Sequence, residues 1–202
     1  MTERMPYYNP ELARSGESTP EALAEVVQLL RSPELTNMAL ANNLTVAMIR
    51  PSVGPDANVL NLSDVDAADL IEEQIQELGV VAKFSFRFDP DVLEIFYAGP
   101  SQDAMRAAEP RHQGGFETKW DEFKHLMVAE PTTVLVLFAE EDAITKWRDH
   151  LGHWNIEANR DPTTIRGRLG VDNFNNLVHG SDSTESVMRE LDLIAQSIEK
   201  TI

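Results

Sequence analysis

The chain contains no cysteine, which excludes disulfides, thiolate metal sites and thiol nucleophiles and suits a reducing compartment. It also lacks an apolar run long enough to cross a bilayer. The longest such run, Thr132–Ala139, has the length of a strand. Residues 1–19 contain no apolar segment of the kind that forms the core of a secretory signal. These absences predict a cytoplasmic protein that does not enter the membrane.

Positive charge is scarce, because 17 Lys and Arg residues stand against 34 Asp and Glu residues, giving a net charge of −17. Such a chain is a poor general binder of nucleic acid or anionic membrane, since both are polyanions. Its few arginines would bind a small phosphate compound if they converged on one pocket. The simpler interpretation of the acidity is solubility. Hydrophobic residues make up 42% of the 202 residues, which predicts one folded globular domain with an extension.

Residues 1–43 are predicted to be an N-terminal extension with a short helix. The helix begins at Ser18-Thr-Pro-Glu, where a proline and an acidic residue fall in the first turn. Leu23, Val26, Val27 and Leu30 then follow at helical spacing. This amphipathic helix is expected to pack on the main domain or on another subunit. The main domain is predicted to comprise residues 44–202.

Strands alternate with helices in the main domain. Strands are predicted at residues 44–50, 80–88, 132–138 and 177–178. Helices are predicted before Gly79 as C-cap, from Asp89, at 116–127, at 142–151 and from Ser183. A polar excursion follows Gly54, and residues 99–115 are predicted to be a surface loop. This order predicts an α+β fold: a ferredoxin-like, split βαβ sandwich with a four-stranded antiparallel sheet and helices packed on it.

One histidine, His179, lies in a pattern suited to chemistry, within Asn176-Leu-Val-His-Gly-Ser-Asp-Ser183. Gly180 allows a tight turn, and the serines and aspartate after it are able to cap the next helix. Glu190 lies seven residues after Ser183, so its carboxylate can face the same side as the turn. A carboxylate bonded to one ring nitrogen would fix the tautomer of a nucleophilic imidazole. The alternative is a structural histidine at a strand-to-helix junction, and the spacing alone leaves both open.

The other four histidines carry weaker signals. They occupy a charged loop, a helix and a helix end: His112, His125, His150 and His153. The last two are three residues apart and could share a metal ion on a helix, but no third ligand stands at a suitable spacing. A surface or helix-end position is the simpler interpretation of all four.

Three separated motifs resemble the nucleoside diphosphate kinase family in both residue type and spacing. They are Thr163-Thr-Ile-Arg-Gly167, the run around His179, and Glu190. A weaker similarity extends from Thr45 to about Leu193. The resemblance implies transfer of the terminal phosphate of a nucleoside triphosphate to a diphosphate through a phosphohistidine, with Mg²⁺ held by the nucleotide phosphates and not by a protein metal site. It also implies a homo-oligomer, either a hexamer or another assembly built from dimers.

The resemblance assigns roles residue by residue. His179 resembles the phosphorylated nucleophile and Glu190 the carboxylate that orients it, with Ser181 supporting Glu190 and Tyr97 beside the histidine. The nucleotide and phosphate ligands implied by the same resemblance are Arg50, Arg148, Arg166, Asn176 and Trp120. Among these, Asn176 resembles the residue near the ribose hydroxyl, and Trp120, with Phe116 as the alternative, is the candidate for stacking on the base.

Two departures from the family pattern concern the triphosphate. The family has a lysine where this chain has Arg50, and a guanidinium is larger and planar. The loop at 153–161 is about one residue longer and lacks the threonine of the family. These changes favour a second hypothesis, a kinase-like domain with weak or no turnover that acts as a regulatory or assembly module. Phosphotransfer remains the first hypothesis because the histidine motif is intact.

Overall fold

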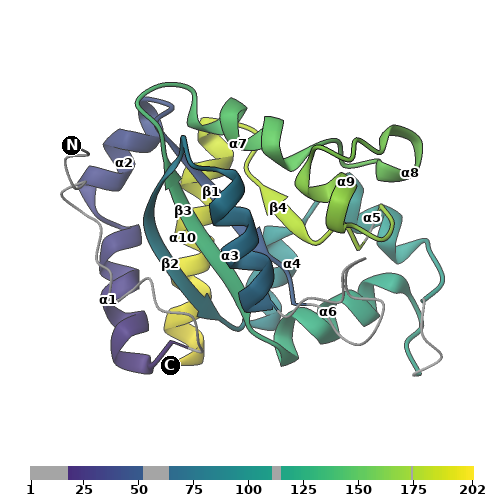
Figure 1. Cartoon of the computed structure of the whole chain (residues 1–202). Helices are drawn as coiled ribbons and strands as arrows, with labels where there is room; N and C mark the ends of the chain where they lie inside the picture. The colour runs from purple at the N-terminus through teal and green to yellow at the C-terminus, as the bar shows by residue number, and fades with distance from the viewer. Residues whose placement is uncertain (1–17, 52–63, 111–114, 174) are drawn as a thin grey trace.

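The computed structural model describes residues 18–51, 64–110, 115–173 and 175–202. Within them, one antiparallel sheet is formed by β1 (Leu44–Ile49), β2 (Gly79–Phe86), β3 (Thr132–Phe138) and β4 (Val178–Gly180). The strand order across the sheet is β2-β3-β1-β4 (Figure 1). β1 and β2 are both antiparallel to β3, which lies between them, so they run parallel to each other. The predicted ferredoxin-like α+β fold with a split βαβ sheet is therefore confirmed.

Alternate side chains of the central strand β1 enter two separate hydrophobic cores. Val46 and Met48 lie in the first core, whereas Ala47 and Ile49 lie in the second. This alternation is the two-residue period of a strand, and every residue of β1 is buried because helices cover both faces. A strand buried on both sides needs a nearly continuous apolar sequence, which is the pattern that predicted it.

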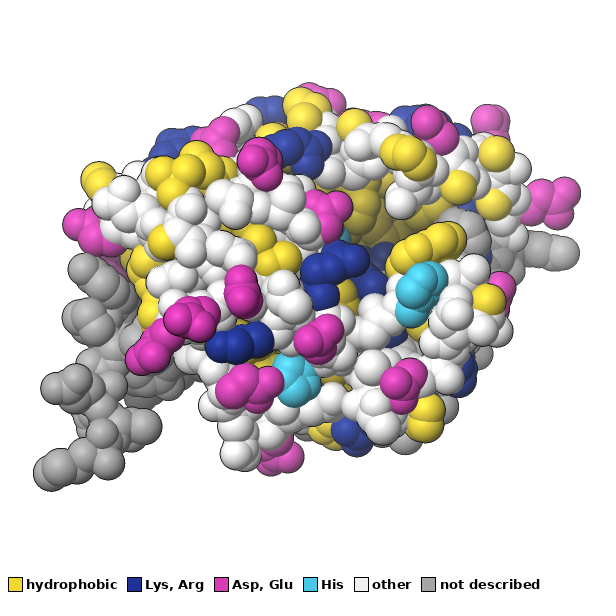
Figure 2. Space-filling view, turned by 90° about the horizontal axis from the view of Figure 1, so that it is seen from above, with side chains coloured by type: hydrophobic (Ala, Val, Ile, Leu, Met, Phe, Trp, Pro, Cys, Tyr) yellow, Lys and Arg dark blue, Asp and Glu magenta, His cyan; other side chains and the backbone are white. Residues whose placement is uncertain are grey.

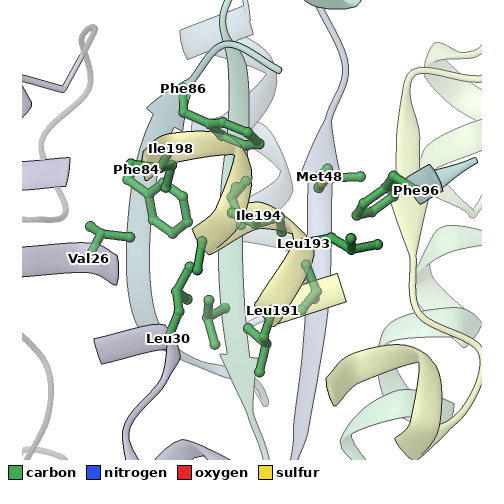
Figure 3. Packing of buried hydrophobic residues seen from close by; sticks show 14 of the residues in the cluster. Val26, Leu30, Met48, Phe84, Phe86, Phe96, Leu191, Leu193, Ile194 and Ile198 are labelled. Carbon is green, nitrogen blue, oxygen red and sulfur yellow. The ribbon is translucent and has the colours of Figure 1, made fainter. Parts of the chain in front are cut away.

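The first core lies between the sheet and several helices, among them α10 (Thr184–Thr201), α1 (Pro20–Leu30) and α2 (Pro33–Leu40). Figure 3 shows how side chains of α1, β2 and α10 meet there, among them Val26, Leu30, Phe84, Phe86, Ile194 and Ile198. The N-terminal extension thus contributes to the same core as the last helix of the chain.

Within its described residues, 18–43, the extension forms two helices where the sequence predicts one. Each begins with a proline in its first turn, and the preceding residue caps it. Thr19 Oγ1 accepts a hydrogen bond from the amide of Ala22 (3.3 Å), and Ser32 Oγ accepts one from Leu35 (3.2 Å). The second start signal, Ser32-Pro-Glu, therefore repeats the chemistry of the first.

The second core is covered by α3 (Asp64–Gln74), α7 (Ala143–Leu151) and α9 (Ile165–Leu169). The predicted C-cap at Gly79 is wrong, because α3 ends at Gln74 and Gly79 is the first residue of β2. Apolar residues beyond the end of α3 are buried in the connection to β2. Their spacing therefore made the predicted helix too long.

In the described part of the connection from β2 to β3 lie three helices: α4 (Pro90–Phe96), α5 (Pro100–Arg106) and α6 (Lys119–Ala129). Residues 99–115 are therefore not all loop, as the sequence predicts, because α5 occupies their first part. Gly99, at φ 134°, allows the chain to turn, and the proline after it begins the helix. Here a Gly-Pro pair that is typical of a loop marks the start of a helix.

Another short helix, α8 (Ile156–Asn159), lies with α9 in the long connection between α7 and β4. The excursion predicted after Gly54 falls mainly on residues 52–63, outside the described part of the chain. No helix within the described ranges is both long enough and apolar enough to cross a membrane.

Candidate functional site

The candidate nucleophile lies on the edge strand of the sheet. His179 is the middle residue of β4 and pairs with Met48 of β1. The sequence predicted a strand at 177–178, just before the histidine, whereas the observed strand β4 begins at Val178 and includes His179. After β4 the chain enters α10, whose N-cap Ser183 accepts a hydrogen bond from the amide of Ser186 (3.1 Å). This cap fixes where the helix begins, and so fixes which residues of α10 face back toward the strand.

Glu190 is the residue of α10 that meets the histidine. Its Oε1 lies 2.9 Å from His179 Nε2, and its Oε2 accepts a hydrogen bond from Ser181 Oγ (2.6 Å). The carboxylate is almost fully buried, with 6% of the side chain exposed, whereas 23% of the histidine side chain is exposed. Both carboxylate oxygens are thus held, and the ring is oriented through Nε2. The other ring nitrogen, Nδ1, takes no part in this bond with Glu190.

Aromatic rings pack against the imidazole on one side. The ring of Phe96 lies 5.5 Å from that of His179, and the ring of Tyr97 lies 6.1 Å from it, both nearly edge-on. The hydroxyl of Tyr97 is buried and has no hydrogen-bond partner among the described residues. Burial raises the pKa of Tyr97 to about 12, so the phenol stays neutral at ordinary pH. A neutral hydroxyl beside the histidine is an available hydrogen-bond donor.

Arg166 anchors the strand that carries His179. Its Nη2 and Nε donate to the carbonyl of Val178 (3.0 and 3.3 Å), and its Nη1 donates to the carbonyl of Gly152 (3.1 Å). Burial, followed by the charges of Arg50 and Arg148, lowers the pKa of Arg166. Arg166 is therefore repelled by the guanidinium groups of both Arg50 and Arg148, and an anion bound beside it would relieve that repulsion.

The other two candidate phosphate ligands, Arg50 and Arg148, lie on different elements from Arg166. Arg50 follows β1, donates to Asn176 Oδ1, and has its guanidinium carbon 5.7 Å from the centre of the Phe123 ring. Burial lowers its pKa as well. Arg148 is exposed on α7. Figure 2 shows Lys and Arg side chains gathered beside a hollow in this face of the molecule, with hydrophobic and histidine side chains at its rim.

The backbone before His179 has an unusual conformation. Leu177 has φ 67°, in the left-handed region that leucine rarely occupies. Its carbonyl nevertheless accepts a hydrogen bond from the amide of Arg50 (2.9 Å), and its side chain is buried in the second core. Burial and this bond hold the strained residue in place, and the kink separates Asn176 from the strand that follows.

Gly180 does not form the predicted turn. It lies in β4 without a positive φ, and the reason for glycine is space. A Cβ at this position would lie 2.2 Å from Nε1 of Trp147, whose ring is fully buried. The indole N–H of Trp147 has no partner among the described residues. Close packing of an indole against the strand is therefore what excludes a side chain beside His179.

The prediction that Trp120 stacks on a base is contradicted, because its ring is buried with 1% exposure. Its indole N–H donates to Glu94 Oε1 (3.1 Å), and the guanidinium of Arg106 lies 5.4 Å from its ring. The resemblance suggested the ligand role, whereas the helical spacing of Trp120 with other apolar residues is that of a core residue. The alternative, Phe116, is half-buried against the ring of His125.

The loop after Gly152 is held by its own contacts. Asn155 Oδ1 accepts a hydrogen bond from the amide of Ala158 (3.0 Å), so this side chain caps α8. Arg160 donates to three backbone carbonyls, those of Gly167, Gly170 and Val171. Sequence reasoning missed this arginine, and no spacing signal marked it. Its bonds give the longer loop a defined position next to α9.

His150 and His153 do not form a metal site in the structure. His150 pairs with Glu77, and His153 Nδ1 accepts a hydrogen bond from the amide of Asn155 (3.0 Å). Across the described residues, no group of three histidine or carboxylate side chains is arranged to hold a metal ion.

The chain is similar to proteins of known family. A family model described as nucleoside diphosphate kinase matches residues 100–199. Nucleoside diphosphate kinase 6 of Danio rerio is 29% identical over 153 residues, which cover 75% of each chain. The nucleoside diphosphate kinase of Geotalea daltonii is 48% identical over 67 residues, which cover 33% of this chain and only 48% of that protein.

A solved structure agrees with these matches. The nucleoside diphosphate kinase of Aquifex aeolicus superposes with a TM-score of 0.53 at 28% identity, covering 75% of this chain and 94% of that chain. The residues matched by the family model include Arg148, Arg166, His179 and Glu190, which the fold brings together around the edge strand β4. The chain therefore resembles the nucleoside diphosphate kinase family in sequence over residues 100–199 and in fold over 75% of its length.

Proposed function

We propose that the protein transfers the terminal phosphate of a nucleoside triphosphate to a nucleoside diphosphate through a phosphohistidine on His179. The observation that carries the proposal is the contact between His179 Nε2 and the buried Glu190 carboxylate, which Ser181 holds from the other side. This arrangement fixes an imidazole for attack, and it adjoins the arginines that a phosphate would need.

The chemistry follows from which ring nitrogen is engaged. Nε2–H donates to Glu190, so Nδ1 carries the lone pair that attacks the γ-phosphorus. The Nδ1–P bond forms while the bond from the γ-phosphorus to its bridging oxygen breaks, and the nucleoside diphosphate leaves with that oxygen. A second diphosphate then takes the phosphoryl group by the reverse step. Glu190 stabilises the positive charge of the phosphorylated ring.

The cations stabilise the charge that spreads over the phosphate oxygens in the transition state. Arg148 and Arg166 are assigned to the phosphates, and Arg50 joins them from the end of β1. Asn176, on the far side of the Leu177 kink, is assigned to the ribose, and the Tyr97 hydroxyl donates to the transferring group. Mg²⁺ bound to the nucleotide phosphates supplies further charge neutralisation when present.

The test is direct labelling of the purified protein. Incubation with ATP labelled on the γ-phosphate and Mg²⁺ should give a labelled protein whose phosphate is stable to base and released by acid, as expected of a phosphohistidine. Chasing with an unlabelled nucleoside diphosphate should move the label to the nucleotide. A protein that takes no label is not a phosphotransferase of this kind, and the regulatory or assembly hypothesis would then replace the proposal.

Replacing Glu190 by glutamine should lower phosphotransfer by about 10- to 100-fold, because an amide holds the ring without stabilising its charge. The measurement is the rate of enzyme labelling in a single turnover. Glu185→Gln is the matched control, since this glutamate lies exposed in the first turn of the same helix. Equal rates for Glu190→Gln and the control would remove Glu190 from the mechanism.

A further inference from the structure

The loop between α7 and α9 is fastened to the segment that leads into the strand of His179. Arg160 Nη1 donates to the carbonyl of Gly167 (2.8 Å), and its Nη2 donates to the carbonyls of Gly170 (3.1 Å) and Val171 (3.2 Å). These carbonyls lie in the last turn of α9 and just beyond it, where a helix leaves its carbonyl groups without partners of its own. A guanidinium suits that position because it carries several donors in a fixed plane. In Figure 1, α8 lies next to α9 on the β4 side of the sheet.

A second contact joins α8 to the far end of the same segment. The amide of Glu157, in α8, donates to Asn173 Oδ1 (3.2 Å), and Asn173 Nδ2 donates to Glu157 Oε2 (3.1 Å). The donor and the acceptor of the Asn173 side chain are thus both engaged by α8. Arg160 and Glu157 therefore hold residues 170–173 at two points.

Gly170 shows how closely α8 approaches the candidate site. A Cβ at this position would lie 2.9 Å from Cδ1 of Ile156, a buried residue of α8. It would also lie 2.6 Å from the carbonyl oxygen of Arg166 and 3.1 Å from Cα of Asn176. The side chain of α8 and the backbone of the site therefore meet at Gly170 with no space between them. A displacement of α8 would be transmitted to that backbone.

The same segment orients the side chain of Asn176. Asn176 Nδ2 donates to the carbonyl of Asn173 (3.1 Å), and Asn176 Oδ1 accepts a hydrogen bond from Arg50. The first bond determines which way round the amide lies, and so it presents the oxygen to Arg50. The contacts of α8 with residues 170–173 therefore reach two of the groups assigned to the nucleotide.

We propose that Arg160 is a positioning residue, which sets Asn176 for a ribose hydroxyl by holding residues 170–173 from outside the site. The inference rests on the proposed function, in which Asn176 is assigned to the ribose. Arg160 acts through the three carbonyls that its guanidinium already binds, and it does not touch the nucleotide. Loss of Arg160 therefore weakens the binding of a nucleotide that carries ribose hydroxyls more than that of one without them. A general loss of structure would weaken both equally.

The test is the binding of ADP, and of dideoxy-ADP that lacks both ribose hydroxyls, to the full-length protein with Mg²⁺, measured by isothermal titration calorimetry. Arg160→Gln should weaken ADP binding about 10-fold, the effect of one lost hydrogen bond, and dideoxy-ADP binding by less than about 2-fold. Arg160→Lys keeps the charge and several donors, so its effect should fall between those of the wild type and Arg160→Gln. Arg168→Gln is the matched control, because it removes the same charge from the exposed side of α9, where Arg168 donates to Gln74 (3.1 Å). This control should bind both nucleotides as the wild type does.

Unchanged ADP binding in Arg160→Gln would overturn the proposal, as would an equal loss for both nucleotides. If Arg160→Gln does not fold, Asn173→Ala decides by the same two measurements, because it removes the second contact with α8 without changing the charge. Calorimetry needs no turnover, so a protein that shows the expected difference yet takes no label from ATP removes the proposed phosphotransfer alone. A wild-type protein that binds no ADP, or binds ADP and dideoxy-ADP equally well, would overturn this inference together with the assignment of Asn176.

Discussion

Replacement of His179 by asparagine is expected to abolish labelling from ATP and to lower phosphotransfer by at least about 10,000-fold. Asparagine has no ring nitrogen to attack phosphorus, yet its amide can still donate to Glu190. The fold should survive, because the histidine contributes little to either core. The measurement is steady-state transfer from ATP to a second nucleoside diphosphate, together with the thermal midpoint of unfolding.

The chain offers a close control in His150, which also pairs with a glutamate, Glu77, but at the surface. His150→Asn should leave both labelling and transfer unchanged. If His179→Asn keeps its activity, or if both variants lose it equally, the phosphohistidine is elsewhere or the mechanism has no such intermediate.

Gly180→Ala is expected to destabilise the folded protein by about 2–3 kcal/mol, because the new methyl group would overlap the buried indole of Trp147. Neither the strand nor the ring is free to move, since β4 pairs with β1 and the indole is enclosed in the second core. The free energy of unfolding from urea titration measures the effect. Activity should fall too, because the substitution displaces the residue next to His179.

A double-mutant cycle separates this overlap from a backbone effect. In a Trp147→Leu background, the smaller side chain leaves room for the methyl group, so Gly180→Ala should cost much less than it does in the wild type. The same cost in both backgrounds would show that Trp147 is not the cause.

Periodicity predicted the parts of the fold that bury apolar surface. Thr132–Phe138 is a strand within its predicted limits, and Ser183 caps α10 where the sequence predicted the helix to begin. The spacing from Ser183 to Glu190 also placed the glutamate toward the turn, and in the structure it meets His179. These predictions succeeded because each depends on local geometry: the strand period, the helical turn, or the hydrogen bond of a cap.

Contacts between distant segments could not be predicted from the sequence. No local pattern shows that Trp147 packs against Gly180, so the glycine was assigned to a turn. Nothing near Leu177 marks its left-handed backbone, which buried neighbours impose. Trp120 has the spacing of a surface aromatic and of a core residue alike, and only the fold decides between them.

Arg166 has a consequence for how relatives of this protein should be compared. Three of its N–H groups hold Val178 and Gly152, so in the proposed function the same side chain would serve both the architecture and the anion. A relative that no longer catalyses the reaction would still retain this arginine, because the fold depends on its hydrogen bonds. Arg148 is exposed on α7 and is under no such structural demand. Its loss in a relative would therefore be the earlier sign that catalysis has been given up.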